Sequence, residues 1–215
     1  MIGNVLLLHG LGRTGGSMRT LAAAARREGL VTCAPSYAAR RHTMEAIVAD
    51  LRPRIAAFTS RTDDPVHIVT HSLGGLVARA LIQAERPARL GRVVMLAPPN
   101  MGSELADLVY RMRLDRILLG PVGAHLRTTR LEEDEQLLGP IDYDLGIIAG
   151  NRALDPIFPR LIMSRPNDGK VTVAATRVPG MTDHIVLSVS HTLMVYDRRV
   201  VEQTMAFLRD GVFRH

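Results

Sequence analysis

The chain has 215 residues, of which 47% are hydrophobic and 22% are charged, values that predict one soluble globular domain with a sizeable core. A single cysteine, Cys33, excludes an intrachain disulfide and any metal site that needs several cysteine ligands. The 27 Lys and Arg residues exceed the 21 acidic ones and give a net charge of +6, but they are scattered, so we expect no nucleic-acid partner.

The N-terminal sequence MIGNVLLLHG has no basic region before its short apolar run, so no secretory signal peptide is recognisable. No stretch approaches the roughly 20 apolar residues that a transmembrane helix needs. We therefore expect a cytoplasmic protein without a transmembrane segment, unless an export segment preceded this chain.

Short apolar runs alternate with helical patterns, which is typical of a mostly parallel sheet covered by helices on both faces. Ser17 is the expected N-cap of the first helix, and Gly29 is expected to end it. In chain order we predict a strand at 4–10, a helix at 16–29, a strand at 30–35, a helix at 43–59, a strand at 66–70, a helix at 73–84, a strand at 92–99, an irregular segment at 100–142, strands at 143–150 and 184–190, and a helix at 196–209.

The stretch VTHSLGGLVARAL, residues 69–81, places Ser72 at a sharp turn between a strand and a helix. Ligand sites of open α/β sheets lie at the carboxyl edge of the strands, where this hydroxyl projects. The first N–H groups of the following helix have no partner within it, so they can stabilise an oxyanion beside Ser72. Gly74 lets the helix pass close to the neighbouring strand.

This turn resembles the nucleophile elbow, G-x-S-x-G, of the α/β-hydrolase family. The sequence here is T-H-S-L-G, so Thr70 replaces the first glycine of the pattern. The stretch LLLHGLGRTGGS resembles the family's His-Gly oxyanion loop. That resemblance implies an oxyanion hole formed by the backbone N–H groups of Leu11 and Leu73, with His9 ordering the loop. The glycine-rich turn could instead hold a phosphate, but it contains no G-x-x-x-x-G-K-[ST] pattern.

The stretch SRPNDGKVTV resembles the acid loop of the same family and implies that Asp168 is the acid of a catalytic triad. Asn-Asp-Gly is also an ordinary turn sequence. Two other carboxylates, Asp155 and Asp183, are alternatives, although each is expected to cap or terminate an element instead.

The stretch VLSVSHTLMVYD places His191 between the last strand and the last helix, the position of the general base in the family. His184, at the start of that strand, is the alternative. His71 adjoins Ser72, but neighbouring side chains in the elbow point apart, so we interpret it as a pocket or packing residue.

These residue types suit acyl transfer. A serine hydroxyl needs a base to remove its proton, an imidazole can accept and return that proton, and a carboxylate fixes the tautomer of the imidazole. Neither a metal nor an organic cofactor is required.

The insertion at 100–142 begins with PPNMGSELA, which resembles the corresponding stretch of bacterial lipases. We expect Met101 and Leu105 to bind substrate there. An amphipathic helix in this insertion either packs on the sheet or belongs to a lid or cap segment.

Together these features predict a single α/β-hydrolase domain over 1–215, a three-layer sandwich with a compact, mostly parallel sheet of about six strands and a short lid-like insertion. The resemblance implies a lipase-like carboxylesterase that acts on small-molecule esters of apolar acids through an acyl-serine intermediate. A thioesterase or amidase with the same residues, or a non-catalytic ligand-binding protein of this fold, is the alternative.

Overall fold

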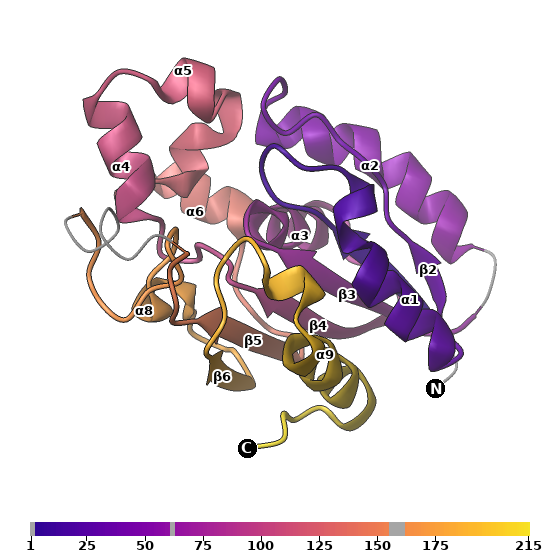
Figure 1. Cartoon of the computed structure of the whole chain (residues 1–215). Coiled ribbons are helices and arrows are strands. Elements are labelled where there is room, and N and C mark those ends of the chain that lie inside the picture. Colours follow the sequence, from indigo (N-terminus) through magenta and orange to yellow (C-terminus); the bar gives the residue numbers. More distant parts are fainter. Residues whose placement is uncertain (1–2, 61–62, 155–161) are drawn as a thin grey trace.

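A parallel sheet forms the centre of the computed structural model, which describes residues 3–60, 63–154 and 162–215. Within these residues the sheet has six strands in the order β2-β1-β3-β4-β5-β6 (Figure 1). The strands are β1 (Asn4–Leu8), β2 (Val31–Cys33), β3 (Val66–His71), β4 (Leu90–Leu96), β5 (Leu145–Gly150) and β6 (Asp183–Leu187). Every pair of neighbouring strands is parallel, so all carboxyl ends lie at one edge.

Helices connect the strands and cover both faces of the sheet. The described α-helices are α1 (Arg19–Arg27), α2 (Met44–Thr59), α3 (Leu73–Ala84), α4 (Glu104–Arg111), α5 (Asp115–Leu118), α6 (Glu132–Leu138), α8 (Val173–Thr176) and α9 (Arg198–Asp210). Three 3₁₀ turns are described as well, at Gly15–Met18, Pro121–Leu126 and Met194–Tyr196. No described helix has the length and hydropathy that crossing a bilayer would require.

The strands bury alternate side chains in two separate apolar layers, as the period of two in a strand requires. Leu6 and Leu8 of β1 pack in the layer covered by α2 and α3. Val5 and Leu7 pack in the layer covered by α1 and α9, which lie in front of the sheet in Figure 1. The predicted three-layer α/β arrangement is therefore confirmed.

The start of the first helix differs from the prediction. Ser17 is not an N-cap, because it lies inside the 3₁₀ turn and its hydroxyl donates to the carbonyl of Thr14 at 2.7 Å. The α-helix begins only at Arg19 and has no capping side chain. Gly29 follows its end with a φ of 85°, the left-handed conformation expected there.

The insertion contains α4, α5 and α6 and has more helix than the irregular segment expected from the sequence. In Figure 1, α4 and α5 project at the upper left, while α6 lies beside α3. The insertion leaves the sheet at the end of β4, so it stands next to the carboxyl edge of the strands.

Candidate active site

Ser72 occupies a strained turn between β3 and α3. Its φ of 56° and ψ of −126° lie outside the regions that non-glycine residues ordinarily adopt. A hydrogen bond from its backbone N–H to the carbonyl of Leu96, at 2.8 Å, ties this turn to the end of β4. The strain is thus held by the sheet, and the hydroxyl is presented at the carboxyl edge.

The residues on either side of Ser72 explain how the turn is packed. A Cβ on Gly74 would lie 2.4 Å from the carbonyl oxygen of Leu8, so only glycine lets α3 approach β1 this closely. Thr70, in the place of the first glycine, is fully buried. It faces Gly75, where a Cβ would already lie 3.5 Å from the Thr70 hydroxyl. That distance is an ordinary contact, so glycine is required here by Pro98 and Met95, whose nearest atoms would lie 2.9 and 3.2 Å from the same Cβ.

A chain of two hydrogen bonds links Ser72, His191 and Asp168. The Oγ atom of Ser72 lies 2.9 Å from Nε2 of His191, and Nδ1 of His191 lies 2.8 Å from Oδ2 of Asp168. His191 is 4% exposed and Asp168 is 2% exposed, so the pair is shielded from water. In this geometry the carboxylate can fix the imidazole tautomer whose Nε2 accepts a proton from the hydroxyl.

The loop after β5 holds Asp168 through its backbone. Oδ1 of Asp168 accepts hydrogen bonds from the N–H groups of Lys170, at 3.0 Å, and Val171, at 2.8 Å. The backbone N–H of His191 donates to the carbonyl of Asp168 at 3.0 Å. One carboxylate oxygen therefore orders the loop, and the other remains for His191.

His71 contacts the backbone of His191. Its Nε2 donates to the carbonyl of His191 at 2.9 Å, and the two rings lie 4.9 Å apart. Burial, followed by the nearby His191, holds the pKa of His71 well below its usual range, so the ring stays neutral. His71 is thus a packing residue beside Ser72 and also a contact of the loop that carries His191.

His9 orders the loop that follows β1. Its Nδ1 donates to the carbonyl of Gly10 at 2.9 Å, and its Nε2 accepts from the backbone N–H of Tyr37 at 3.2 Å. The two rings stack at 4.0 Å, and the Tyr37 hydroxyl donates to the His9 carbonyl. Burial lowers the pKa of His9, which agrees with the neutral ring that these bonds require. The loop reaching Leu11 is thus fixed on both sides.

A cavity of about 420 Å³ opens beside Ser72 and His191. Leu11 lines this cavity. The side chain of Leu73 is fully buried in the core, and its backbone forms the first residue of α3. The apolar part of the wall comes mostly from the insertion: Leu105, Ala106, Val109, Leu118, Leu119 and Leu126. Leu105, for which the sequence predicts substrate binding, is thus one of the residues that line this cavity.

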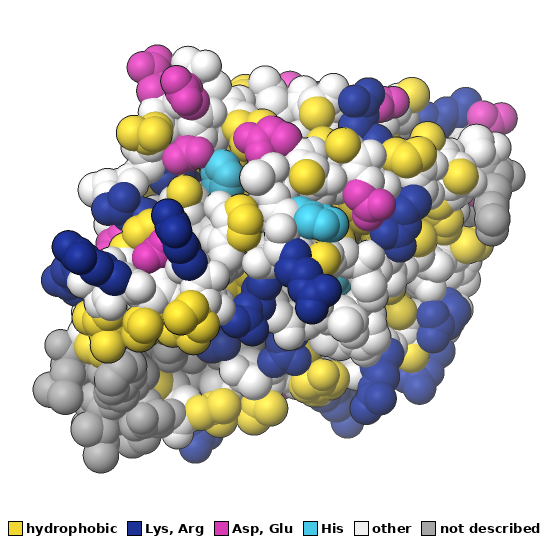
Figure 2. Space-filling view, turned by 90° about the horizontal axis from the view of Figure 1, so that it is seen from above, with side chains coloured by type: hydrophobic (Ala, Val, Ile, Leu, Met, Phe, Trp, Pro, Cys, Tyr) yellow, Lys and Arg dark blue, Asp and Glu magenta, His cyan; other side chains and the backbone are white. Residues whose placement is uncertain are grey.

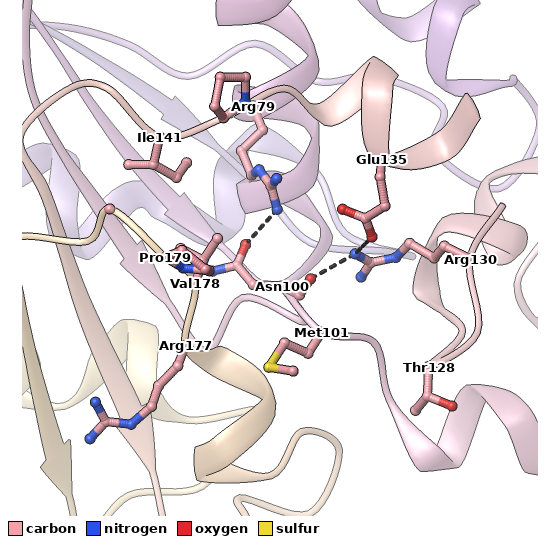
Figure 3. A pocket seen from close by; sticks show the side chains of 12 residues that line it. Arg79, Asn100, Met101, Thr128, Arg130, Glu135, Ile141, Arg177, Val178 and Pro179 are labelled. Atoms are coloured by element: carbon pink, nitrogen blue, oxygen red, sulfur yellow. Dashed lines mark hydrogen bonds and ion pairs between the residues drawn. The ribbon is translucent and has the colours of Figure 1, made fainter. Parts of the chain in front are cut away.

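Met101 does not line this cavity, although the sequence placed it in the substrate site. It is 61% exposed and borders a different pocket of about 570 Å³ (Figure 3). There Asn100 lies between two buried arginines, accepting from Arg130 at 2.6 Å through its carbonyl and from Arg79 at 3.5 Å through its side chain. The chain turns between Met101 and Leu105, so the two side chains face separate pockets.

The alternative acid and base lie elsewhere. Asp183 is at the amino end of β6, where it accepts from the N–H groups of His184, at 2.7 Å, and Phe213, at 2.9 Å. His184 contacts the hydroxyl of Thr176 at 2.9 Å, and burial, followed by Arg177, lowers its pKa to about 4. The third alternative, Asp155, lies outside the described residues. Among the described residues, no group of His, Cys, Asp and Glu side chains could hold a metal ion.

Sequence reasoning missed three cationic residues of the cavity. Arg13, Arg40 and Lys170 line it beside Ser72, although they come from separate loops. No motif contains all three, so no local pattern could have grouped them. Lys170, the only lysine in the chain, directly follows the Asn-Asp-Gly turn and was the one available signal.

Several solved structures have a fold similar to that of this chain. The mature lipase BlEst2 of Bacillus licheniformis has a similar structure, with a TM-score of 0.75 and 21% identity over 95% of this chain and 91% of that one. Phospholipase PlaB of Legionella pneumophila has a TM-score of 0.65 and 22% identity, over 81% of this chain and 45% of that one. A gene product of Listeria innocua, lin2722, has a TM-score of 0.65 at 12% identity, over 100% of this chain and 96% of that one.

No curated protein sequence matches this chain. A family model described as the alpha/beta hydrolase family matches residues 5–213, nearly the whole chain. The chain therefore belongs to the alpha/beta hydrolase family.

Proposed function

We propose that this protein is a serine hydrolase that cleaves carboxylic esters of apolar acids through an acyl-serine intermediate. The observation that carries the proposal is the hydrogen-bonded chain from Ser72 through His191 to Asp168, at 2.9 and 2.8 Å. Membership of the alpha/beta hydrolase family and the structural likeness to a lipase support a hydrolase.

In the acylation half of the reaction, Oγ of Ser72 attacks the ester carbonyl carbon while Nε2 of His191 takes the hydroxyl proton. Asp168 stabilises the imidazolium that forms. The backbone N–H groups of Leu11 and Leu73 are the proposed donors to the oxyanion, since one lies on the loop that His9 orders and the other begins α3. The tetrahedral intermediate then collapses: the bond to the alcohol oxygen breaks, and His191 protonates the departing oxygen.

The second half regenerates the enzyme. A water molecule gives a proton to Nε2 of His191 and attacks the acyl carbon, and the bond to Ser72 breaks as the proton returns to Oγ. The sum is one ester and one water converted to an acid and an alcohol. His191 relays every proton that is transferred in this scheme.

The cavity supports an apolar acyl group. Leu105 and Val109 of α4 and Leu118 of α5 give it an apolar wall beside Ser72. Each methylene that this wall covers contributes about 0.8 kcal/mol to binding. We propose that the helices of the insertion, within 100–142, act as the acyl-binding cap of a single domain spanning the chain.

Labelling with a fluorophosphonate tests the nucleophile directly. Wild-type protein is expected to react at Ser72, and Ser72→Ala is expected to lose the label. Loss of the nucleophile should lower the turnover of p-nitrophenyl butyrate by on the order of 10⁴ to 10⁶. Thermal unfolding of Ser72→Ala checks that the fold survives.

Label at another serine, or activity retained in Ser72→Ala, would contradict the proposal. A matched panel of a butyrate ester, a thioester and an amide separates the leaving-group classes, because the nucleophile alone does not select among them. Absence of labelling and of turnover in the wild type would leave a ligand-binding protein of the hydrolase fold.

A further inference from the structure

We propose that the natural substrate carries an anionic group, a carboxylate or a phosphate, on the alcohol side of the scissile ester. This inference rests on the proposed function and names the substrate class of the same site. It comes from the charges that line the cavity beside Ser72, which the lipase-like assignment does not use.

Three cations from different parts of the chain meet at the cavity. Arg13 follows β1, Arg40 precedes α2, and Lys170 lies in the loop of Asp168. A guanidinium N–H of Arg13 donates to the carbonyl of Thr192 at 3.3 Å, and one of Arg40 donates to the carbonyl of Ile117. A guanidinium has five N–H donors, so both arginines are held in place with donors left over.

In the described part of the structure, the negative charge of Asp168 acts on Lys170, but less strongly than the positive charge of Arg13. Arg13, Arg40 and Lys170 form no ion pair among the described residues, although most of the ion pairs found there involve an arginine. Among the described residues that line the cavity, none is Asp or Glu. The nearby Asp168 is 2% exposed, and its two oxygens already bind His191 and the loop backbone.

The cations also act on one another. Burial, followed by the positive charge of Arg13, lowers the pKa of Lys170. Arg13 and Lys170 both contribute to the depressed pKa of His71, so both charges reach the immediate surroundings of Ser72. An anion bound between them would relieve this repulsion and form charge-assisted hydrogen bonds.

The apolar and the cationic residues of the cavity suit different parts of such a substrate. The wall from the insertion, with Leu105 and Val109, is apolar and suits the acyl chain. We place the alcohol part beside Arg13 and Lys170, because these cations would bind its anionic group. Figure 2, seen from above, shows that both basic and hydrophobic side chains are exposed on this face of the molecule.

Three butyrate esters with related phenol leaving groups test the inference: 4-(butyryloxy)benzoate, 4-(butyryloxy)phenyl phosphate and the neutral 4-(butyryloxy)benzamide. Each kcat/KM is divided by the rate of hydroxide-catalysed hydrolysis of the same ester, which removes differences in leaving-group reactivity. At low salt, at least one anionic ester is expected to exceed the amide by about tenfold, the size of one charge-assisted contact. The benzoate and phosphate arms show which anion is preferred.

Salt and single substitutions show whether these cations cause the preference. Raising NaCl from 20 to 500 mM is expected to reduce the anionic-to-neutral ratio, because screening shortens the reach of the charges. Lys170→Gln and Arg13→Gln are each expected to lower the ratio several-fold. Arg89→Gln is the matched control: it removes a positive charge just before β4, at the opposite edge of the sheet, and is expected to keep the wild-type ratio.

Equal normalised rates for all three esters would overturn the inference, as would a ratio unchanged in both Lys170→Gln and Arg13→Gln. Either result would leave the proposed function intact, because hydrolysis of the neutral ester and labelling of Ser72 report on that function separately.

Discussion

Asp168 has two oxygens with different tasks, and this makes the site sensitive to a change of one atom. Oδ1 accepts two backbone N–H groups, and only Oδ2 faces Nδ1 of His191. An asparagine in this position keeps the loop contacts only if its oxygen replaces Oδ1. Its NH₂ group would then face His191 and favour the imidazole tautomer with a proton on Nε2, which cannot accept one from Ser72.

Asp168→Asn is therefore expected to fold normally but to lower kcat for p-nitrophenyl butyrate by on the order of 10⁴. Steady-state kinetics and a thermal unfolding curve measure the two effects. Asp183→Asn is the matched control: this carboxylate lies at the other edge of the sheet and anchors the C-terminal segment, so its activity is expected to stay near that of the wild type. Similar losses in both variants would argue against Asp168 as the acid.

At the residue scale, the sequence predicted residues in the loops that follow strands, such as Ser72 after β3 and His191 after β6, because parallel strands bring their carboxyl ends to one edge. It did not predict their supporting contacts. The bond from His71 to the carbonyl of His191 joins residues 120 positions apart, and Tyr37 reaches His9 across 28 positions. Such contacts depend on side-chain directions that no local pattern encodes.

The insertion provides a wall of the cavity through α4 and α5, two helices with only half-buried or exposed large apolar residues. Leu105 and Leu118 line the cavity, whereas Ile117, next to Leu118, is 68% exposed and does not. These helices therefore neither pack wholly on the sheet nor stand free in solvent. Leu105, Val109 and Leu118 face the cavity, and the other large apolar side chains of these helices do not line it.

We expect kcat/KM to depend on the length of the acyl chain, because the apolar side chains of α4 and α5 contact it. Butyrate to octanoate p-nitrophenyl esters should exceed acetate in kcat/KM, with each covered methylene contributing about 0.8 kcal/mol. Leu105→Ala is expected to flatten the rise with chain length, because the cavity loses apolar contact. A series of kcat/KM values from acetate to decanoate measures the effect.

Ile117→Ala is the control for Leu105→Ala, since it shortens an apolar side chain of the same insertion that lies outside the cavity. Its chain-length series is expected to match that of the wild type. A wild-type series that peaks at acetate would contradict an apolar acyl pocket and point to a short-chain esterase.

Periodicity predicted the elements of the core well because burial on one face imposes it, as in α3 and β3. Periodicity predicted the structure less well where an element is only partly buried. The first helix begins with a 3₁₀ turn in place of a capped α-helix, and the insertion forms short helices whose apolar residues face a cavity. In the insertion, Met101 and Leu105 diverge because the chain turns between them, which spacing alone does not reveal.

Across the whole molecule, five histidines have a lowered pKa and burial is the first cause for each: His9, His67, His71, His125 and His184. They lie in different parts of the molecule: near the site, in or at the ends of strands, and, for His125, in the insertion. The folded protein therefore keeps these imidazoles neutral. Below a pH of about 6.5, the unfolded chain binds more protons at these residues than the folded protein does.

The free energy of unfolding is thus expected to be highest above pH 6.5 and to fall as the pH is lowered toward the depressed values, which for His184 is about 4. Each fully buried histidine contributes on the order of 1 kcal/mol per pH unit in this window. Urea unfolding at pH 7.5, 6 and 5 measures the slope.

The variant His67→Asn tests the contribution of one histidine far from Ser72. In the wild type, Nδ1 of His67 accepts a hydrogen bond from the backbone N–H of Arg92 at 2.9 Å, and the asparagine oxygen can replace this acceptor without titrating. Its unfolding free energy is expected to depend less steeply on pH than that of the wild type. A stability that rises between pH 7.5 and 5, or an unchanged slope in His67→Asn, would mean that these imidazoles are protonated in the folded protein.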